Sequence, residues 1–125
     1  MECLNNNSLL FENNSSALTG GVCFVESSAV FRGNEIVRVE GNSAAAGGGA
    51  FYMYDLCTMQ FNEKISFSDN NASACGGAIW IGAVDITPSE ASGLVLVQNG
   101  SIDFTYSLSH IYHQKICTPH PRVWL

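Results

Sequence analysis

The chain has 125 residues, of which 46% are hydrophobic and only 13% are charged, and its formal net charge is −6. This length allows one domain or part of one, and the hydrophobic content is sufficient for a buried core. The acidic balance argues against nucleic-acid binding, which requires a basic face. No apolar run reaches the roughly 20 residues of a membrane-spanning helix. The opening residues, MECLNNNSLLF, lack a basic region and an apolar stretch, so we expect no secretory signal in them.

A repeat of 28 residues follows a lead-in over residues 1–9. Each copy has an apolar residue, an asparagine three positions later and a glycine pair that begins nine positions after the apolar residue. These residues are Phe11, Asn14, Gly20 and Gly21; Val39, Asn42, Gly48 and Gly49; and Phe67, Asn70, Gly76 and Gly77. A further FxxN motif, from Phe31 to Asn34, lies inside the first period. A shared register in three copies is typical of a repeat architecture.

Short segments rich in β-branched and aromatic residues predict the strands within each period. They lie at 22–26, 29–31 and 36–39 in the first period and at 50–54, 57–61 and 65–67 in the second. Gly, Asn, Asp and Ser separate them, and no segment has sustained helical periodicity. Three strands in each 28-residue period predict an all-β solenoid of about three coils, stacked about 4.8 Å apart.

Stacking gives each repeated position a structural role. We expect Phe11, Val39 and Phe67 to stack in the interior. We expect Asn14, Asn42 and Asn70 to form an amide ladder at a corner where asparagine tolerates positive φ. The glycine pairs would allow a tight corner with φ above zero.

Alternation along the strand after each glycine pair assigns its two faces. The inward set is uniformly apolar: Cys23, Val25, Phe51, Met53, Ile79 and Ile81. The outward set is Val22, Ala50 and Ala78, followed by the aromatic residues Phe24, Tyr52 and Trp80. This aromatic row is a candidate surface for stacking on sugar rings or packing against a partner protein. The alternative is an ordinary outward strand position.

The FSDN and GGAI motifs of residues 67–79 are similar to the FxxN and GGA[ILV] motifs of the chlamydial polymorphic outer membrane proteins. They also resemble those of large repeat proteins in marine invertebrates and other eukaryotes. The resemblance covers roughly residues 10–100. It implies a right-handed parallel β-helix exposed outside the cell or at its surface, often with an adhesive role, and it brings no catalytic residues.

The repeat pattern weakens after residue 100. The next glycine pair is expected at positions 104 and 105, which hold Phe104 and Thr105, although Val95 and Asn99 are typical of the start of a fourth unit. We therefore place the β-helix region at residues 10–100. We expect residues 101–125 to be an irregular tail outside the array, either disordered or misjoined in a truncated gene model.

Candidate metal ligands and catalytic carboxylates are few. His110, His113, Cys117 and His120 in the tail match no standard zinc spacing, which favours a chance cluster. Glu12 and Glu40 align in the repeat, but they form no carboxylate pair suited to acid–base work, and the aspartates form none either: Asp55, Asp69, Asp85 and Asp103. We expect no enzyme activity, no metal and no cofactor.

Cysteines and glycosylation motifs complete the candidate sites. The five cysteines cannot all pair within the chain, and Cys23, Cys57 and Cys75 occupy different positions of the coil, so no ladder of disulfides is predicted. Cys23 is interpreted as a buried small hydrophobe.

Five asparagines fit N-x-[ST]: Asn6, Asn13, Asn14, Asn71 and Asn99. In a eukaryotic secreted chain Asn71 or Asn99 are the candidates for a glycan, and Asn14 is a poor one if it lies in the amide ladder.

The leading hypothesis is a structural or adhesive extracellular repeat module that presents its faces to protein or glycan partners. One alternative is a fragment of a solenoid carbohydrate-active enzyme, a lyase or hydrolase, whose site lies outside this segment. Another is a truncated gene model without dedicated activity. Open strand edges at the end coils also predict self-association.

Overall fold

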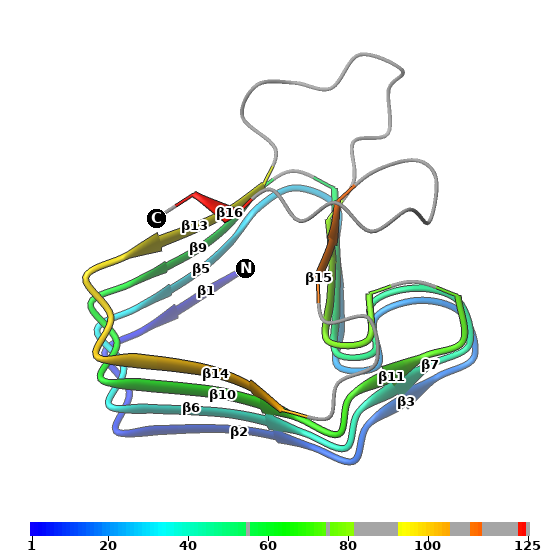
Figure 1. Ribbon diagram of the computed structural model, residues 1–125, viewed down its shortest axis with the longest axis horizontal. Helices are drawn as coiled ribbons and strands as arrows, with labels where there is room; N and C mark the ends of the chain where they lie inside the picture. Colours follow the sequence, from blue (N-terminus) through cyan, green and yellow to red (C-terminus); the bar gives the residue numbers. More distant parts are fainter. Residues whose placement is uncertain (55, 75, 82–92, 106–110, 114–122, 125) are drawn as a thin grey trace.

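A computed structural model of the chain describes residues 1–54, 56–74, 76–81, 93–105, 111–113 and 123–124. Within these ranges the chain forms only strands and connecting turns (Figure 1). The same ranges contain no helix with the length and hydropathy needed to span a membrane.

The strands belong to four parallel sheets, which we name A to D. Sheet A contains β1 (Glu2–Leu4), β5 (Ala29–Arg32), β9 (Leu56–Gln60), β13 (Gly93–Val97) and β16 (Val123–Trp124). Sheet B contains β2 (Ser8–Glu12), β6 (Ile36–Glu40), β10 (Lys64–Ser68) and β14 (Ser101–Thr105). Sheet C contains β3 (Ser15–Ser16), β7 (Ser43–Ala44) and β11 (Asn71–Ala72). Sheet D contains β4 (Cys23–Val25), β8 (Phe51–Met53), β12 (Ile79–Ile81) and β15 (Ile111–His113).

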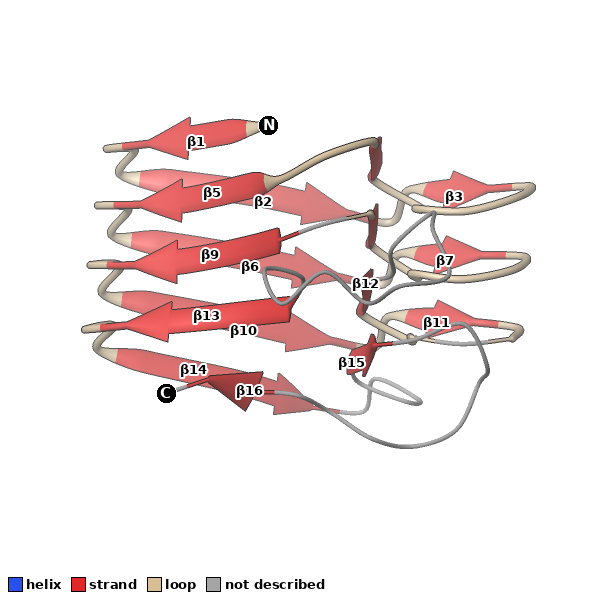
Figure 2. Cartoon of the chain, turned by 90° about the horizontal axis from the view of Figure 1, so that it is seen from above, coloured by secondary structure: helices blue, strands red, loops and turns tan. Residues whose placement is uncertain are grey.

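In the first three coils the chain passes through sheets A, B, C and D in turn, and successive coils stack in register (Figure 2). In sheet B, Val37 lies opposite Leu9 on one side and Ile65 on the other, so equivalent residues are 28 positions apart. This arrangement confirms the predicted parallel β-helix with 28-residue coils. Each of the first three coils has one strand more than the sequence predicted, because the two residues after each ladder asparagine pair as a short strand of sheet C.

Strand pairing continues beyond residue 100, where the sequence analysis ended the repeat region. Ile102 in β14 lies opposite Ile65, at a spacing of 37 residues, and Ile111 in β15 lies opposite Ile79, at a spacing of 32. These altered spacings explain why the 28-residue period does not predict β14 and β15. The expectations for residues 106–110 and 114–122 lie outside the described part of the chain.

The interior is filled by apolar side chains from sheets A, B and D. Val39 and Phe67 are at most 1% exposed and lie in register with Phe11, which is partly exposed in the first coil. Phe51 lies at the centre, and its ring meets the rings of Phe11, Phe31 and Phe67 at centroid distances of 5.6, 5.4 and 6.4 Å. Such edge contacts stabilise aromatic residues beyond the burial of their area.

The prediction that Ala50 and Ala78 point outward is wrong, because both residues are fully buried. They precede β8 and β12, so the alternation of the strand does not extend to them. Their backbones are hydrogen-bonded between coils, with Ala50 N donating to Ala78 O at 2.9 Å and Val22 N donating to Ala50 O at 2.9 Å. Ala50 and Ala78 therefore belong to the buried core and not to the outer face.

Candidate functional site

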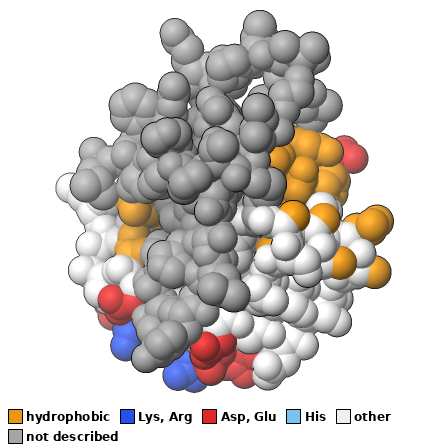
Figure 3. All heavy atoms as spheres, turned by 45° about the vertical axis from the view of Figure 1, so that its right-hand side comes forward, with side chains coloured by type: hydrophobic (Ala, Val, Ile, Leu, Met, Phe, Trp, Pro, Cys, Tyr) orange, Lys and Arg blue, Asp and Glu red, His pale blue; other side chains and the backbone are white. Residues whose placement is uncertain are grey.

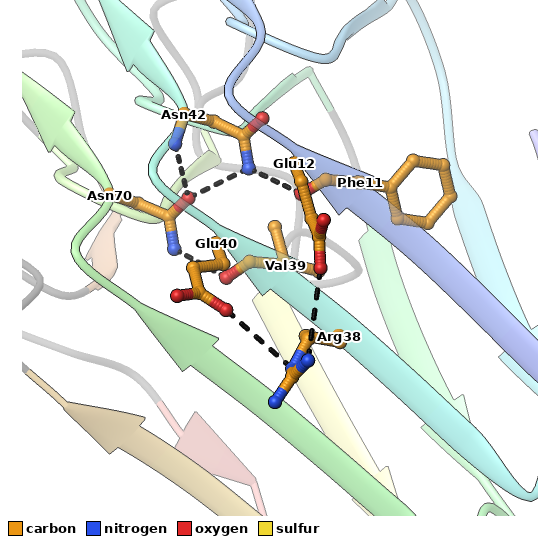
Figure 4. Close-up of polar contacts among 7 residues, drawn as sticks. All are labelled: Phe11, Glu12, Arg38, Val39, Glu40, Asn42 and Asn70. Carbon is orange, nitrogen blue, oxygen red and sulfur yellow. Dashed lines mark hydrogen bonds and ion pairs between the residues drawn. The ribbon is translucent and has the colours of Figure 1, made fainter.

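The three predicted ladder asparagines, Asn14, Asn42 and Asn70, connect neighbouring coils at the end of sheet B. Figure 4 shows the step from Asn42 to Asn70. The Nδ2 group of Asn42 donates to Asn70 Oδ1 at 2.9 Å and to the carbonyl oxygen of Phe11 at 2.8 Å. The backbone N–H of Asn42 also donates to Asn70 Oδ1 at 3.1 Å. Asn42 and Asn70 are fully buried, so the ladder satisfies polar groups that would otherwise be costly inside the protein.

The expected positive φ does not lie at the ladder asparagines. It lies one residue earlier, at Asn13 (55°), Gly41 (64°) and Asp69 (53°). The preceding residue makes the turn, because the asparagine side chain must point inward to reach the next coil. The corner and the ladder are thus formed by adjacent residues.

A second amide ladder, which sequence reasoning missed, lies at the corner between sheets A and B. Its members are Asn6, Asn34, Asn62 and Asn99. Asn34 Nδ2 donates to Asn62 Oδ1 at 2.8 Å, and Asn62 Nδ2 donates to Asn99 Oδ1 at 2.9 Å. The FxxN motif from Phe31 to Asn34 marks one member of this ladder in the sequence. In the other coils cysteine, methionine or leucine replaces the phenylalanine, so the motif does not repeat.

The two glycines of each pair serve different purposes. Only the first has positive φ, as at Gly20 (61°), Gly48 (65°) and Gly76 (65°). A Cβ atom on the second, at Gly49, would collide with the carbonyl oxygen of Gly77 in the next coil and lie 2.6 Å from that of Asn71. The expectation of positive φ is therefore correct for the first glycine, and the second is needed for close approach of neighbouring coils.

The aromatic row consists of Phe24, Tyr52 and Trp80 on the outer face of sheet D. Phe24 and Tyr52 stack at a centroid distance of 5.5 Å and an interplanar angle of 16°, and Tyr52 and Trp80 stack at 4.1 Å and 11°. Tyr54 adds edge contacts to Phe24 at 5.4 Å and to Tyr52 at 5.8 Å. Burial and, to a lesser extent, the neighbouring Tyr54 raise the pKa of Tyr52.

The stacking geometry determines which parts of the aromatic rings a ligand can contact. The stacked rings turn their inner faces toward one another, so the row presents ring edges along its length. Phe24 is 44% exposed, and Tyr52 and Trp80 are partly buried. The backbone register places Tyr112 of β15 opposite Trp80, so this position of the coil holds an aromatic residue in the fourth coil as well. On one side of the molecule, Figure 3 shows hydrophobic side chains in separate exposed groups among polar surface.

The aligned carboxylates Glu12 and Glu40 lie opposite each other on the outer face of sheet B. Arg38 lies between them, with Nη1 3.8 Å from Glu12 Oε1 and Nε 3.5 Å from Glu40 Oε2 (Figure 4). All three side chains are about half exposed, so these ion pairs contribute little to stability. The arginine offsets the repulsion between the two stacked carboxylates.

The remaining candidate carboxylates and metal ligands lie in different parts of the fold or outside the described residues. Asp69 is at a corner and Asp103 is in β14, while Asp55 and Asp85 lie outside the described residues. His110, Cys117 and His120 also lie outside them, and of His113 only the backbone in β15 is described. The described ranges contain no group of three or more His, Cys, Asp or Glu residues placed to hold a metal ion.

Three cysteines are free thiols in the structure: Cys3, Cys23 and Cys57. Cys57 is fully buried, and burial raises the pKa of its thiol to about 12. Cys23 is only partly buried, contrary to the prediction of a buried hydrophobe, because it lies in the first coil, which has one neighbouring coil. Burial likewise raises the pKa of Cys3. Cys75 and Cys117 lie outside the described residues.

Comparison with protein families supports the resemblance drawn from the motifs. The family model described as the Chlamydia polymorphic membrane protein repeat matches residues 8–26 and 64–82. These segments span β2 to β4 and β10 to β12, and each contains an asparagine of the first ladder and a glycine pair. Comparisons with curated proteins and with solved structures gave no match. The chain therefore contains, at two places, repeats of the Chlamydia polymorphic membrane protein type.

Proposed function

We propose that the chain is a structural and adhesive repeat module of an extracellular or surface protein. In this proposal the β-helix is a rigid scaffold, and its outer faces contact partner molecules. The match to a membrane protein repeat supports the location. The proposal assigns no catalytic role to the described residues.

The observation that carries the proposal is the aromatic row on sheet D. The stacked rings of Phe24, Tyr52 and Trp80 are held on strands whose backbones pair in register. Tyrosine and tryptophan contribute strongly to protein interfaces, since each combines a large apolar area with a polar group. A row already ordered by stacking also loses little conformational entropy when a partner binds.

Ring orientation favours a protein partner over a glycan along most of the aromatic row. Stacking on a sugar requires a free ring face, and the inner faces are occupied by neighbouring rings. Ring edges and the hydroxyl groups of Tyr52 and Tyr54 suit contacts with apolar and hydrogen-bonding side chains. A glycan would therefore be restricted to ring faces that no neighbouring ring covers.

Binding measurements with matched variants test this proposal. The purified chain is applied to panels of extracellular proteins and of glycans, beside Trp80→Ala and Leu10→Ala. Leu10 is the control, because it is 58% exposed on sheet B, away from the aromatic row. We expect Trp80→Ala to weaken binding at least about tenfold, as for a large aromatic residue that contributes strongly to an interface, and Leu10→Ala to leave it unchanged.

Circular dichroism shows whether each variant keeps the β-sheet fold, and Phe24→Ala provides a second substitution in the aromatic row if Trp80→Ala does not fold. Full binding by both folded variants would remove the aromatic row from the proposal.

A further inference from the structure

The five N-x-[ST] motifs of the chain are not equivalent in the folded structure. An N-linked glycan is attached to the side-chain Nδ2 atom of asparagine and replaces one of its two hydrogens. An acceptor compatible with the fold therefore needs an Nδ2 group that does not hold the coils together and that faces solvent. These two requirements separate the five asparagines.

Three of the asparagines belong to the amide ladders. Asn99 Nδ2 donates to the carbonyl oxygen of Met59 at 2.7 Å, and its Oδ1 accepts from Asn62 Nδ2 at 2.9 Å. Asn6 Nδ2 donates to Leu4 O at 3.1 Å and to Asn34 Oδ1 at 2.9 Å. Asn14 Nδ2 donates to Asn42 Oδ1 at 2.9 Å. Asn6 Nδ2 uses both of its hydrogens, and a sugar on Asn14 Nδ2 or Asn99 Nδ2 would stand directly beside a hydrogen bond that joins two coils.

Asn13 and Asn71 are exposed and take part in neither ladder. Asn13 lies at a corner with φ of 55°, and its Oδ1 occupies the space that a Cβ atom on Gly41 would need, so its amide is packed against the next coil. Asn71 opens β11, at the edge of sheet C, in register with Ser43. Its backbone N–H donates to Asn42 O at 2.8 Å, which fixes the backbone independently of the side chain.

The geometry points to Asn71 as the acceptor of an N-linked glycan. This inference adds a modification to the proposed function and rests on the export that the proposed function requires. In the transfer, Asn71 Nδ2 bonds to the anomeric carbon of a lipid-pyrophosphate-linked oligosaccharide. The bond between that carbon and the pyrophosphate oxygen breaks, the lipid pyrophosphate leaves, and the amide gives up one proton. A glycan here would also shield the edge of sheet C against pairing with another strand.

Secretion of the whole chain from a eukaryotic cell, behind a cleavable signal, tests the assignment. Glycan sites are mapped by mass spectrometry before and after enzymatic deglycosylation. The matched variants are Ser73→Ala, which removes the Asn71 motif, and Ser101→Ala, which removes the Asn99 motif, and neither changes a ladder asparagine. We expect a glycan at Asn71 that is lost in Ser73→Ala and kept in Ser101→Ala.

A secreted, folded chain without a glycan at Asn71, or with one at Asn6, Asn14 or Asn99, would overturn the inference. Glycan sites are also mapped on protein that the cell retains. An unoccupied Asn71 in that fraction would likewise contradict the inference. The binding experiment uses unglycosylated protein from bacteria, so failure of one test does not imply failure of the other.

Discussion

Replacement of Asn42 by alanine tests the amide ladder most directly. The Asn42 side chain makes four hydrogen bonds: its Nδ2 donates to Phe11 O and Asn70 Oδ1, and its Oδ1 accepts from the N–H and the Nδ2 of Asn14. The side chain is fully buried, so water cannot replace these partners without entering the protein. At about 1 kcal/mol for each bond, the expected loss is about 4 kcal/mol. A small domain has a total stability of about 5–15 kcal/mol, so this variant would be close to unfolding.

Urea denaturation followed by circular dichroism measures this loss. The control is Asn7→Ala, because Asn7 is exposed and belongs to neither ladder, and its free energy of unfolding should change by less than about 0.5 kcal/mol. If Asn42→Ala loses less than about 1 kcal/mol with an unchanged denaturant slope, the ladder does not stabilise the fold as argued.

Three further predictions concern other parts of the coil. Gly49→Ala should prevent folding or shift the coils apart, because its Cβ atom meets the backbone of Gly77 and Asn71, and a native-like melting curve would contradict this. Cys57 should resist alkylation in the folded chain, and stability should fall as pH rises from about 9 to about 12, because the unfolded thiol ionises first. Cys57→Ala should lack that part of the pH dependence. The partly exposed apolar side chains of the first coil, such as Leu9 and Phe11, should cause concentration-dependent association, and a clean monomer by analytical ultracentrifugation would refute it.

Much of the fold could be predicted because, in a solenoid, residues that are one period apart in the sequence lie side by side in space. Residues 28 positions apart, such as Val39 and Phe67, lie opposite each other, so one motif predicts both the interior stack and the first asparagine ladder. The second ladder was missed because only Phe31 completes the FxxN pattern there. The strands β14 and β15 of the fourth coil were missed because their spacing changes to 37 and 32 residues.

The sequence by itself determined the repeat length, the all-β class and the alternation that puts Phe51 inside and Tyr52 outside, since these depend on local periodicity. The tertiary structure alone decided three features: that Ala50 is buried, that the turn lies one residue before Asn42, and that the aromatic rings cover one another's faces. The reason is physical. Periodicity specifies which residues are neighbours, whereas the path of the backbone at each corner specifies which atoms meet.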